Sequence, residues 1–189
     1  MPDFSRGPLF FREVTDPKDL TEIFKLRYLF NIRVGYIEKS SDGKEMESDS
    51  YDDLSTHLGA YDERGGLVGT LRIIHPSSHG FPMEKTFKIV LPPGRREKKL
   101  CEISRLNVRS RIGYPEHRAT LGLIRTAKDV CLSQCLTHCC FAVDARVWEM
   151  YERLRFGFTR MGATRPYMGS PTVPAFVKVH GWLRYLRKT

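Results

Sequence analysis

Hydrophobic and polar residues alternate in several short stretches of the chain, which is the pattern of half-buried strands. Three such stretches lie in the first half of the sequence, at Pro8–Val14, His57–Tyr61 and Leu67–His75. The acidic, glycine-containing segment 62–66 separates the last two and predicts a turn. We therefore expect these two strands to pair as an antiparallel hairpin.

Apolar residues at helical spacing predict three helices. The first starts at Thr15-Asp16-Pro17, where Asp16 suits the cap and Pro17 the first turn, and it fades near residues 34–36. The second runs from about Glu116 to Thr137, and the third runs from Val147 to Leu154. Segment 37–50 shows no periodicity and predicts a loop that leads into an acidic cluster.

Further strands are predicted at Glu102–Val108, at Cys140–Ala145 and from Phe158 toward Val179. Strands and helices then follow one another as strand, helix, a meander of strands, a long helix, strand, helix and terminal strands. This order predicts an α/β (α+β) protein with a central mixed sheet flanked by helices. The sequence contains no linker, so we expect one domain over residues 1–189.

The composition is ordinary for a soluble protein, with 41% hydrophobic residues, but the formal net charge is +9. A basic surplus suits an acidic partner, such as a carrier protein, nucleic acid or an anionic membrane surface. The densest basic stretches, 95–99 and 184–188, are either solvated faces or docking sites. No apolar run approaches the ~20 residues of a membrane span, and the N-terminus lacks a signal-peptide pattern. A cytoplasmic location is the default prediction.

Five cysteines lie at positions 101, 131, 135, 139 and 140, an arrangement that argues against a disulfide framework. Cys131, Cys135 and Cys139 would share one helical face, with His138 nearby. This spacing is not a standard metal motif, and cysteine is also a small core residue. We therefore expect no metal site, although the spacing alone leaves one open.

Acidic and basic residues cluster in three separate stretches. Glu102 and Arg105 lie three residues apart in the predicted strand that opens the stretch CEISRLNVRSR. Arg72 lies in the strand GTLRIIHP, and an acidic cluster precedes that hairpin at Glu47, Asp49 and Asp52. We expect these residues to form one site rather than separate solvated charges.

With these residues, the chain resembles the autoinducer-synthase-like branch of the GCN5-related N-acetyltransferase (GNAT) fold. That branch includes the LuxI-type acyl-homoserine lactone synthases, the long-chain N-acyl amino acid synthases and the exosortase-associated (PEP-CTERM) acyltransferases. Its pattern is an Arg and an aromatic residue in the first helix, E-x-D-x-(F/Y)-D, an Arg in a G-T-x-R strand, a Phe, and E-(I/V)-(S/T)-R. The matching residues here are Arg27 with Phe30, Glu47, Asp49, Asp52, Arg72, Phe87, Glu102 and Arg105.

Departures from the pattern concern both substrates. Tyr36 stands where lactone synthases usually carry Trp at the S-adenosylmethionine pocket. The spacing from Arg27 to Phe30 is one residue shorter than the usual form, and the pyrophosphate loop of acetyl-CoA-dependent members is not cleanly present. The resemblance therefore implies a donor without the CoA nucleotide, namely an acylated carrier protein. Asp52 followed by Leu54-Ser55-Thr56-His57 resembles the exosortase-associated and N-acyl amino acid members more than the lactone synthases.

The resemblance also implies roles for residues. Glu102 and Arg105 are the candidate catalytic residues, with Glu102 as the general base, and backbone N–H groups near Leu106, Asn107 and Val108 would polarise the thioester carbonyl. The alternative is that Glu102 and Arg105 form only a buried ion pair. The acceptor site would comprise Arg27, Tyr36, Glu47, Asp49, Asp52 and Arg72; the alternative is a purely structural salt-bridge network.

The donor would be held by a further set of residues. Arg111 and Arg118 would meet the phosphate of a pantetheine arm near the N-terminus of the Glu116 helix. Phe87, Phe141, Trp148 and Leu154 would contact the acyl chain, although aromatic residues at such spacing also form ordinary cores. His57, His75, His117 and His180 show no partner pattern, and we expect them to be structural.

The sequence thus predicts an N-acyltransferase that moves a medium or long acyl chain from acyl carrier protein, or from acyl-CoA, to the amine of a small molecule such as an amino acid. We expect no bound cofactor and no specific nucleic-acid partner. Two closer alternatives are an acyl-homoserine lactone synthase that uses S-adenosylmethionine and an ordinary acetyl-CoA-dependent N-acetyltransferase. A third is a non-catalytic module that binds nucleic acid or a membrane surface.

Overall fold

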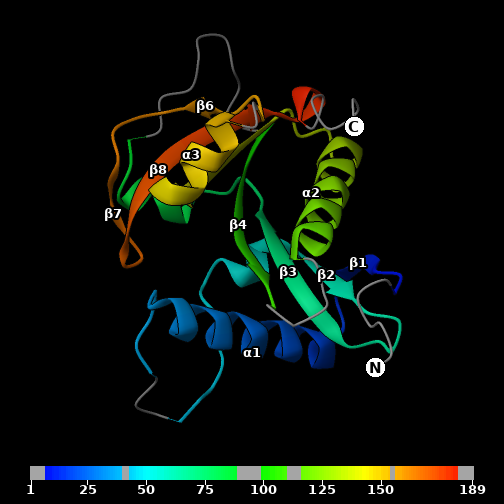
Figure 1. Cartoon of the computed structure of the whole chain (residues 1–189). Helices are drawn as coiled ribbons and strands as arrows, with labels where there is room; N and C mark the ends of the chain where they lie inside the picture. Colours follow the sequence, from blue (N-terminus) through cyan, green and yellow to red (C-terminus); the bar gives the residue numbers. More distant parts are fainter. Residues whose placement is uncertain (1–6, 40–42, 89–98, 110–115, 154–155, 183–189) are drawn as a thin grey trace. The chain divides into compact units, whose positions relative to one another are not determined.

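The computed structural model describes residues 7–39, 43–88, 99–109, 116–153 and 156–182 (Figure 1). Its helices and strands are β1 (Phe10–Val14), α1 (Pro17–Val34), β2 (Ser55–Tyr61), β3 (Leu67–Ile74), β4 (Leu100–Val108), α2 (Glu116–Ser133), β5 (His138–Asp144), α3 (Ala145–Arg153), β6 (Thr159–Arg160), β7 (Arg165–Tyr167) and β8 (Ser170–Lys178). Short 3₁₀ turns form at Asp52–Leu54, Pro82–Lys85 and Val179–Gly181.

The strands within these described residues form one mixed sheet of eight, in the order β1-β2-β3-β4-β5-β8-β6, with β7 paired to β8. The predicted mixed sheet with flanking helices is therefore confirmed. The chain divides into two compact units, and β4 contributes to both. The first unit contains residues up to 73 and residues 105–127; the second contains residues 74–104 and those from 128 onward.

In the first unit, β1 pairs antiparallel with β2 from Phe10↔Tyr61 to Val14↔His57. The predicted hairpin joins β2 to β3. Its turn is closed by Asp62, whose side chain accepts hydrogen bonds from the backbone N–H groups of Arg64 and Gly66 at 3.0 and 2.8 Å. A carboxylate that hydrogen-bonds nearby backbone in this way stabilises a tight turn.

Helix α1 starts where the sequence predicts. Asp16 accepts from the backbone N–H of Lys18 at 2.9 Å, Pro17 occupies the first turn, and Gly35 ends the helix in the left-handed conformation with φ of 77°. The cap and the terminal glycine fix both ends of the helix. Its buried face includes Ile23 and Leu26 and also one charged residue, Arg27.

The first three turns of α2 cover one face of the strands in this unit. The Phe11 ring of β1 lies where a side chain at Gly122 would be, and Gly69 of β3 lies against Leu123. Arg72 is three residues after Gly69 on β3, so alternation along the strand directs it to the opposite face. That face carries the charged residues described below.

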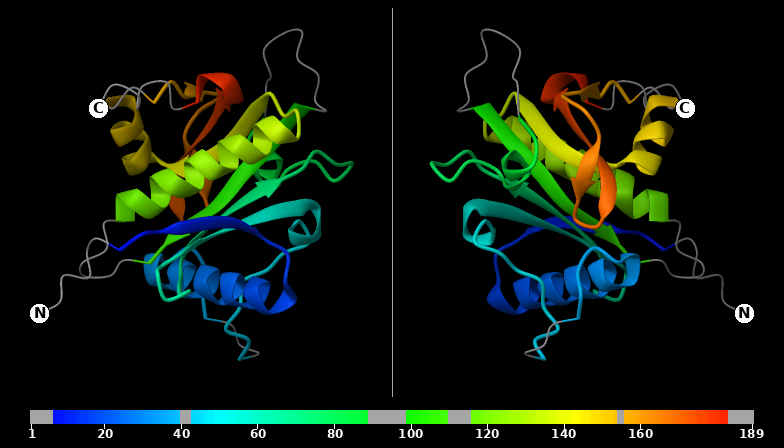
Figure 2. Two further views of the ribbon diagram at one scale, coloured as in Figure 1. Left: turned by 90° about the vertical axis from the view of Figure 1, so that its right-hand side faces the viewer. Right: turned by 90° about the vertical axis from the view of Figure 1, so that its left-hand side faces the viewer.

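In the second unit, β5 and β8 form a long antiparallel pair from His138↔Lys178 to Asp144↔Thr172. Strands β6 and β7 both pair with β8, and β7 folds back on it as a short ribbon (Figure 2). Helix α3 packs on this pair through Trp148, which is buried against Val173 and Ala175. These residues form one hydrophobic cluster of the unit.

The second helix ends earlier than predicted. It stops at Ser133 rather than Thr137, and Cys135 adopts a left-handed conformation with φ of 58°. The sequence shows no glycine at that point, so the apolar pattern suggested four further helical residues. The chain instead turns there and enters β5 at His138.

Arg111, Leu154 and most of the two basic stretches, 95–99 and 184–188, lie outside the described residues. No helix in the described ranges has the length and apolarity of a membrane span. The cytoplasmic location and the single domain stay predictions.

Candidate active site

The first unit contains a network of three arginines and three carboxylates, which we call the charged cluster: Arg27, Glu47, Asp49, Asp52, Arg72 and Arg105. Its members come from α1, from the segment before β2, from β3 and from β4. All six belong to the set that the sequence predicts as one site. The structure therefore brings together five of the predicted acceptor residues and one predicted catalytic residue.

Arg27 lies at the centre of this cluster and is completely buried. Its Nε makes a short hydrogen bond to Glu47, and its Nη1 donates to Asp52 Oδ1 at 2.7 Å. Phe24, one helical turn earlier, places its ring 5.3 Å from the guanidinium carbon. A buried guanidinium requires such partners, because an unpaired charge in the core is strongly destabilising.

Arg72 and Arg105 complete the network. Arg72 Nη1 donates to Asp49 and to Asp52, each at 2.7 Å. Arg105 Nη2 donates to Glu47 Oε1 at 2.6 Å and to Asp49 Oδ2 at 3.3 Å. Each of the three carboxylates thus contacts two arginines.

These contacts keep the carboxylates ionised. Burial alone would raise the pKa of Glu47, Asp49 and Asp52, but hydrogen bonds and charge from the arginines outweigh it. The pKa of each carboxyl group is therefore below its usual value. Carboxylates held in this state are suited to positioning and poorly suited to accepting a proton from a substrate.

The cluster also fixes the segment before β2. The backbone N–H of Glu47 donates to the carbonyl of Phe24 at 3.1 Å, and the N–H of Asp49 donates to Asp52 Oδ2 at 2.7 Å. The end of the predicted 37–50 loop is thus anchored on α1 by both backbone and side chains.

His57 contacts the charged cluster, although its sequence context shows no partner pattern. Its Nε2 lies 3.2 Å from the backbone oxygen of Asp52, and its ring meets Phe24 edge-on at 5.8 Å. Burial lowers the pKa of His57, so the neutral ring is favoured. The sequence carries no signal for this contact, because it depends on how β2 packs on α1.

Arg105 lies within β4 but has a left-handed backbone, with φ of 54°. A non-glycine residue in this region is strained, and such strain is frequent at functional sites. The left-handed residue of this strand is therefore the one whose side chain joins the charged cluster. Arg105 is paired with Glu47 and Asp49 of the charged cluster.

Glu102 belongs to the second unit, where only 2% of its surface is exposed. Its Oε2 accepts a hydrogen bond of 3.1 Å from the backbone N–H of Met83, at the turn Pro82–Lys85. Across the sheet it is paired with Cys140 of β5. The predicted base is thus a buried carboxylate held in place by a backbone donor.

Glu102 also marks the end of a strand pairing. The parallel register between β4 and β5 comprises Leu100↔His138, Cys101↔Cys139 and Glu102↔Cys140. Both strands continue, β4 to Val108 and β5 to Asp144. Parallel strands that stop pairing in this way expose backbone groups to which a ligand can bind.

Aromatic side chains surround the core of the second unit. Phe141 packs with Trp148, and its ring lies 4.8 Å from that of Phe158. Phe87 is buried against Tyr167, with 5.5 Å between ring centres. The predicted acyl-chain residues Phe141 and Trp148 share one cluster, whereas the ring contact of Phe87 is made on the β7 side.

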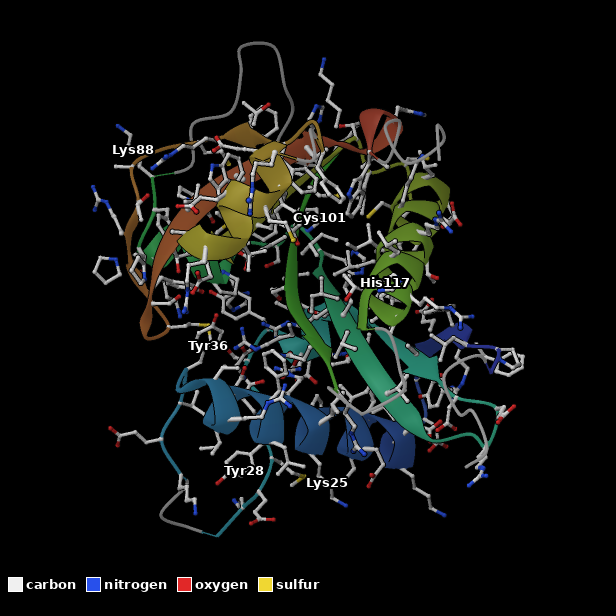
Figure 3. The ribbon with its side chains drawn as sticks, viewed as in Figure 1. Lys25, Tyr28, Tyr36, Lys88, Cys101 and His117 are labelled. Atoms are coloured by element: carbon white, nitrogen blue, oxygen red, sulfur yellow. The ribbon has the colours of Figure 1, made fainter. Side chains whose placement is uncertain are left out.

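The remaining predicted residues are more scattered. Tyr36 is half-buried just after the end of α1 (Figure 3). Arg118 is exposed in the first turn of α2. Leu106 and Val108 are half-buried on β4, while Asn107 is buried and its Oδ1 has no hydrogen-bond partner among the residues that the structure describes. The structure gives no contact that assigns these residues to a ligand.

A buried carboxylate beside an interrupted strand pairing is an arrangement suited to deprotonating an amine and holding an acyl donor. The profile of the N-acyl amino acid synthase FeeM family matches residues 22–178. The chain belongs to this family. Members of the family are acyltransferases, so the non-catalytic alternative is set aside.

Solved structures agree on the fold. FeeM, an N-acyl amino acid synthase from uncultured soil microbes, is 19% identical over 97% of this chain and 96% of its own, with a TM-score of 0.74. The acyl-homoserine lactone synthase LasI is 21% identical over 92% and 91%, with a TM-score of 0.71. BjaI, a CoA-dependent acyl-homoserine lactone synthase solved with MTA, is 20% identical over 91% and 84%, with a TM-score of 0.70. No curated protein is significantly similar in sequence.

These findings confirm the fold and the family that the motifs predicted. The architecture is GNAT-like, and the enzyme class is an acyltransferase. The roles of individual residues remain predictions, because family membership does not assign them.

Proposed function

We propose that this protein transfers a medium or long acyl chain from a thioester to the amine of an amino acid or related small molecule. The observation that supports this most strongly is the position of Glu102. It is a buried carboxylate at the last paired residue of β4 and β5, with its side chain fixed by the Met83 amide. Family membership supports the same reaction class.

In the proposed reaction, Glu102 accepts a proton from the amine, directly or through water. The amine nitrogen then bonds to the thioester carbon, the C–S bond breaks, and the thiolate leaves and regains a proton. A positioned base contributes typically 10²–10⁴-fold to such a step. By analogy with other proteins of the GNAT fold, we assign the backbone N–H groups of Leu106 to Val108 as hydrogen-bond donors to the thioester carbonyl oxygen.

We propose that the charged cluster acts mainly by positioning. Arg27 and Arg72 are completely buried and are engaged by carboxylates, so they are poorly placed to meet a substrate directly. Arg105 is 12% exposed and Asp49 is 30% exposed at the side chain. We therefore assign Arg105 to bind the carboxylate of the acceptor. A guanidinium is well suited to this role because it can donate two parallel hydrogen bonds to a carboxylate.

For the donor, we propose the aromatic cluster of Phe141 and Trp148 as the acyl-chain contact, with Phe87 as a further candidate. Acyl carrier protein is the preferred donor because the net charge of +9 suits an acidic carrier. Arg111 and Arg118 stay candidates for the pantetheine phosphate. CoA is the alternative, and the similarity to the CoA-dependent enzyme BjaI keeps it in consideration.

A second candidate function is acyl-homoserine lactone synthesis. The similarity of the fold to LasI and BjaI favours it. The sequence argues against it at one position, because Tyr36 replaces the Trp that lactone synthases usually carry. The acceptor therefore decides between the two functions.

The test is a reconstituted reaction with the purified full chain. Acyl carrier protein and CoA, each loaded with acyl chains of several lengths, are supplied with a mixture of amino acids or with S-adenosylmethionine, and the products are identified by mass spectrometry. We expect an N-acyl amino acid with the wild type. A lactone together with methylthioadenosine would instead establish the second function.

Glu102→Gln is the decisive variant. The amide oxygen of Gln can still accept the hydrogen bond from Met83, so the fold should persist while the base is lost. We expect a rate loss of about 10²–10⁴-fold. Glu149→Gln, the same change at an exposed residue of α3 in the same unit, should leave the rate unchanged. Equal rates for Glu102→Gln and the wild type would refute the assignment of the base.

A further inference from the structure

Three cysteine sulfurs meet in the buried core of the second unit. Cys101 comes from β4, Cys131 from α2 and Cys139 from β5 (Figure 3 labels Cys101). Their Sγ atoms are separated by 3.3 Å (101 to 139), 3.7 Å (131 to 139) and 3.8 Å (101 to 131). All three residues are completely buried. We call this group the thiol cluster.

The cluster differs from the one that sequence spacing suggested. Cys135 was expected to share a helical face with Cys131 and Cys139, but α2 ends before it and its side chain is exposed. Cys101, which lies 30 residues before Cys131, takes the third position instead. The set is therefore created by the fold, and its spacing of 30 and 8 residues matches no short motif.

The backbone holds two of the sulfurs in register. Cys101 and Cys139 are directly paired across parallel strands, so their side chains leave the sheet on the same face. Cys131 reaches them from the last turns of α2, where its carbonyl accepts a hydrogen bond of 2.9 Å from Leu136. Rigid elements of this kind fix a ligand set more accurately than loops do.

The distances are suited to a metal ion. A tetrahedral ion with metal–sulfur bonds of about 2.3 Å places its sulfurs about 3.8 Å apart. Two of the three separations are within 0.1 Å of that value, and the third is shorter. Within the described part of the chain, no fourth ligand atom joins the three. Three thiolates without a fourth ligand suit soft ions such as Cu⁺, and Zn²⁺ if a small exogenous ligand completes its shell.

We propose that Cys101, Cys131 and Cys139 form a binding site for one soft, thiophilic metal ion, with the three thiolates as its ligands. The ion would link β4, α2 and β5. Because Cys101 precedes Glu102 and Cys139 precedes Cys140, it would clamp the strand pair directly beside the proposed base. The role is structural, and metal bound at a site without solvent access is expected to enter as the chain folds.

The test uses the full chain, purified metal-free under reducing and anaerobic conditions. It is titrated with Cu⁺ and, separately, with Zn²⁺, each against a competing chromophoric chelator. We expect one equivalent of at least one ion per chain, and with Cu⁺ an ultraviolet thiolate-to-metal band. The wild-type Tm should rise by roughly 5–10 °C at saturation with the ion that binds.

Variants identify the ligands. Loss of a residue that only supports a metal ligand usually lowers metal affinity by about 10–100-fold. Cys131→Ala and Cys139→Ala each remove a ligand itself, so we expect a larger loss of affinity. Cys135→Ser removes an exposed thiol, and Cys140→Ala removes a buried thiol whose Sγ donates to the Cys101 carbonyl at 3.3 Å. Both control variants should bind one equivalent as the wild type does.

Three results would overturn the proposal. The first is that neither ion binds stoichiometrically and the wild-type Tm does not change. The second is that binding disappears in Cys135→Ser and persists in Cys131→Ala, which would place the metal on the exposed thiol. The third is a Cys101–Cys139 disulfide in the protein as isolated, detected by mass, which would make this pair a redox couple. The wild-type titration and Tm decide the matter even if an alanine variant fails to fold.

Discussion

The charged cluster of the first unit and the thiol cluster of the second satisfy buried polar atoms in opposite ways. In the first, three arginines and three carboxylates neutralise one another, and each carboxylate has two cationic partners. In the second, three buried sulfurs contact one another, and the Sγ of Cys101 also donates a weak hydrogen bond to the His138 carbonyl. The comparison predicts that removing any one member of the charged cluster lowers the free energy of unfolding strongly. Removing one thiol should lower it only slightly as long as no metal is bound.

Removing one arginine should produce the largest effect on stability. In Arg72→Met, Asp49 and Asp52 lose a buried cation while Arg27 remains. Breaking a buried ion pair in this way costs about 3–5 kcal/mol of unfolding free energy, measured by urea denaturation. Arg12→Met, at an exposed ion pair with Asp19 in the same unit, should change it by less than about 1 kcal/mol. Equal losses for the two variants would show that the charged cluster is not cooperative.

The thiol cluster should respond more weakly in the metal-free chain. Cys139→Ala removes one buried sulfur and leaves a small cavity, which should cost about 1–2 kcal/mol in the same denaturation experiment. Cys135→Ala, at an exposed position, should stay within about 0.5 kcal/mol of the wild type. A loss as large as that of Arg72→Met would contradict the proposed difference between the clusters. In the presence of the metal ion, the difference in unfolding free energy between Cys139→Ala and Cys135→Ala should increase, because only Cys139→Ala loses a ligand.

The smallest effect should come from pH. The folded pKa of His57 is lowered by burial, so its contribution to stability is complete above the unfolded value near 6.5 and declines as pH falls below it. The cluster carboxylates also have lowered pKa values, and their contribution is lost only as pH falls below about 4. His57→Gln should therefore flatten the stability curve between pH 7 and 5, while His79→Gln, at an exposed site, should leave its shape unchanged. An unaltered slope in His57→Gln would argue against a buried neutral ring.

Much of the fold could be read from local pattern. Asp16 and Pro17 define the start of α1, because an aspartate caps the first N–H groups and proline fixes its own φ. Gly65 with Gly66 marks the hairpin turn, because glycine tolerates the left-handed conformation that Gly65 adopts there, with φ of 77°. The end of α2 could not be read, since its apolar spacing continues to Thr137 and Cys135 carries no sign of a left-handed turn. The short strands β6 and β7 are fixed by pairing with β8, which the sequence does not reveal.

Of the two clusters, one could be predicted from the sequence and the other could not. The charged cluster was predictable as a set because its motifs match a family pattern, even though its residues lie up to 78 positions apart (27 to 105). The thiol cluster was not, because it depends on the register that places Cys101 opposite Cys139. The contact of His57 with Asp52 likewise depends on tertiary packing. Spacing along a chain predicts only those sites that one element or one known motif contains.

The backbone and the side chain at position 105 favour different amino acids. Its backbone conformation, with φ of 54°, is one that glycine or asparagine would adopt at little cost, whereas its side chain supplies charge to Glu47 and Asp49. A protein engineer who optimised the backbone alone would choose glycine there and lose the guanidinium. Lysine would keep the charge, but it would lose the forked geometry and relieve none of the torsional cost. Arginine at this position is thus a compromise, and attempts to make the enzyme more stable should leave it in place.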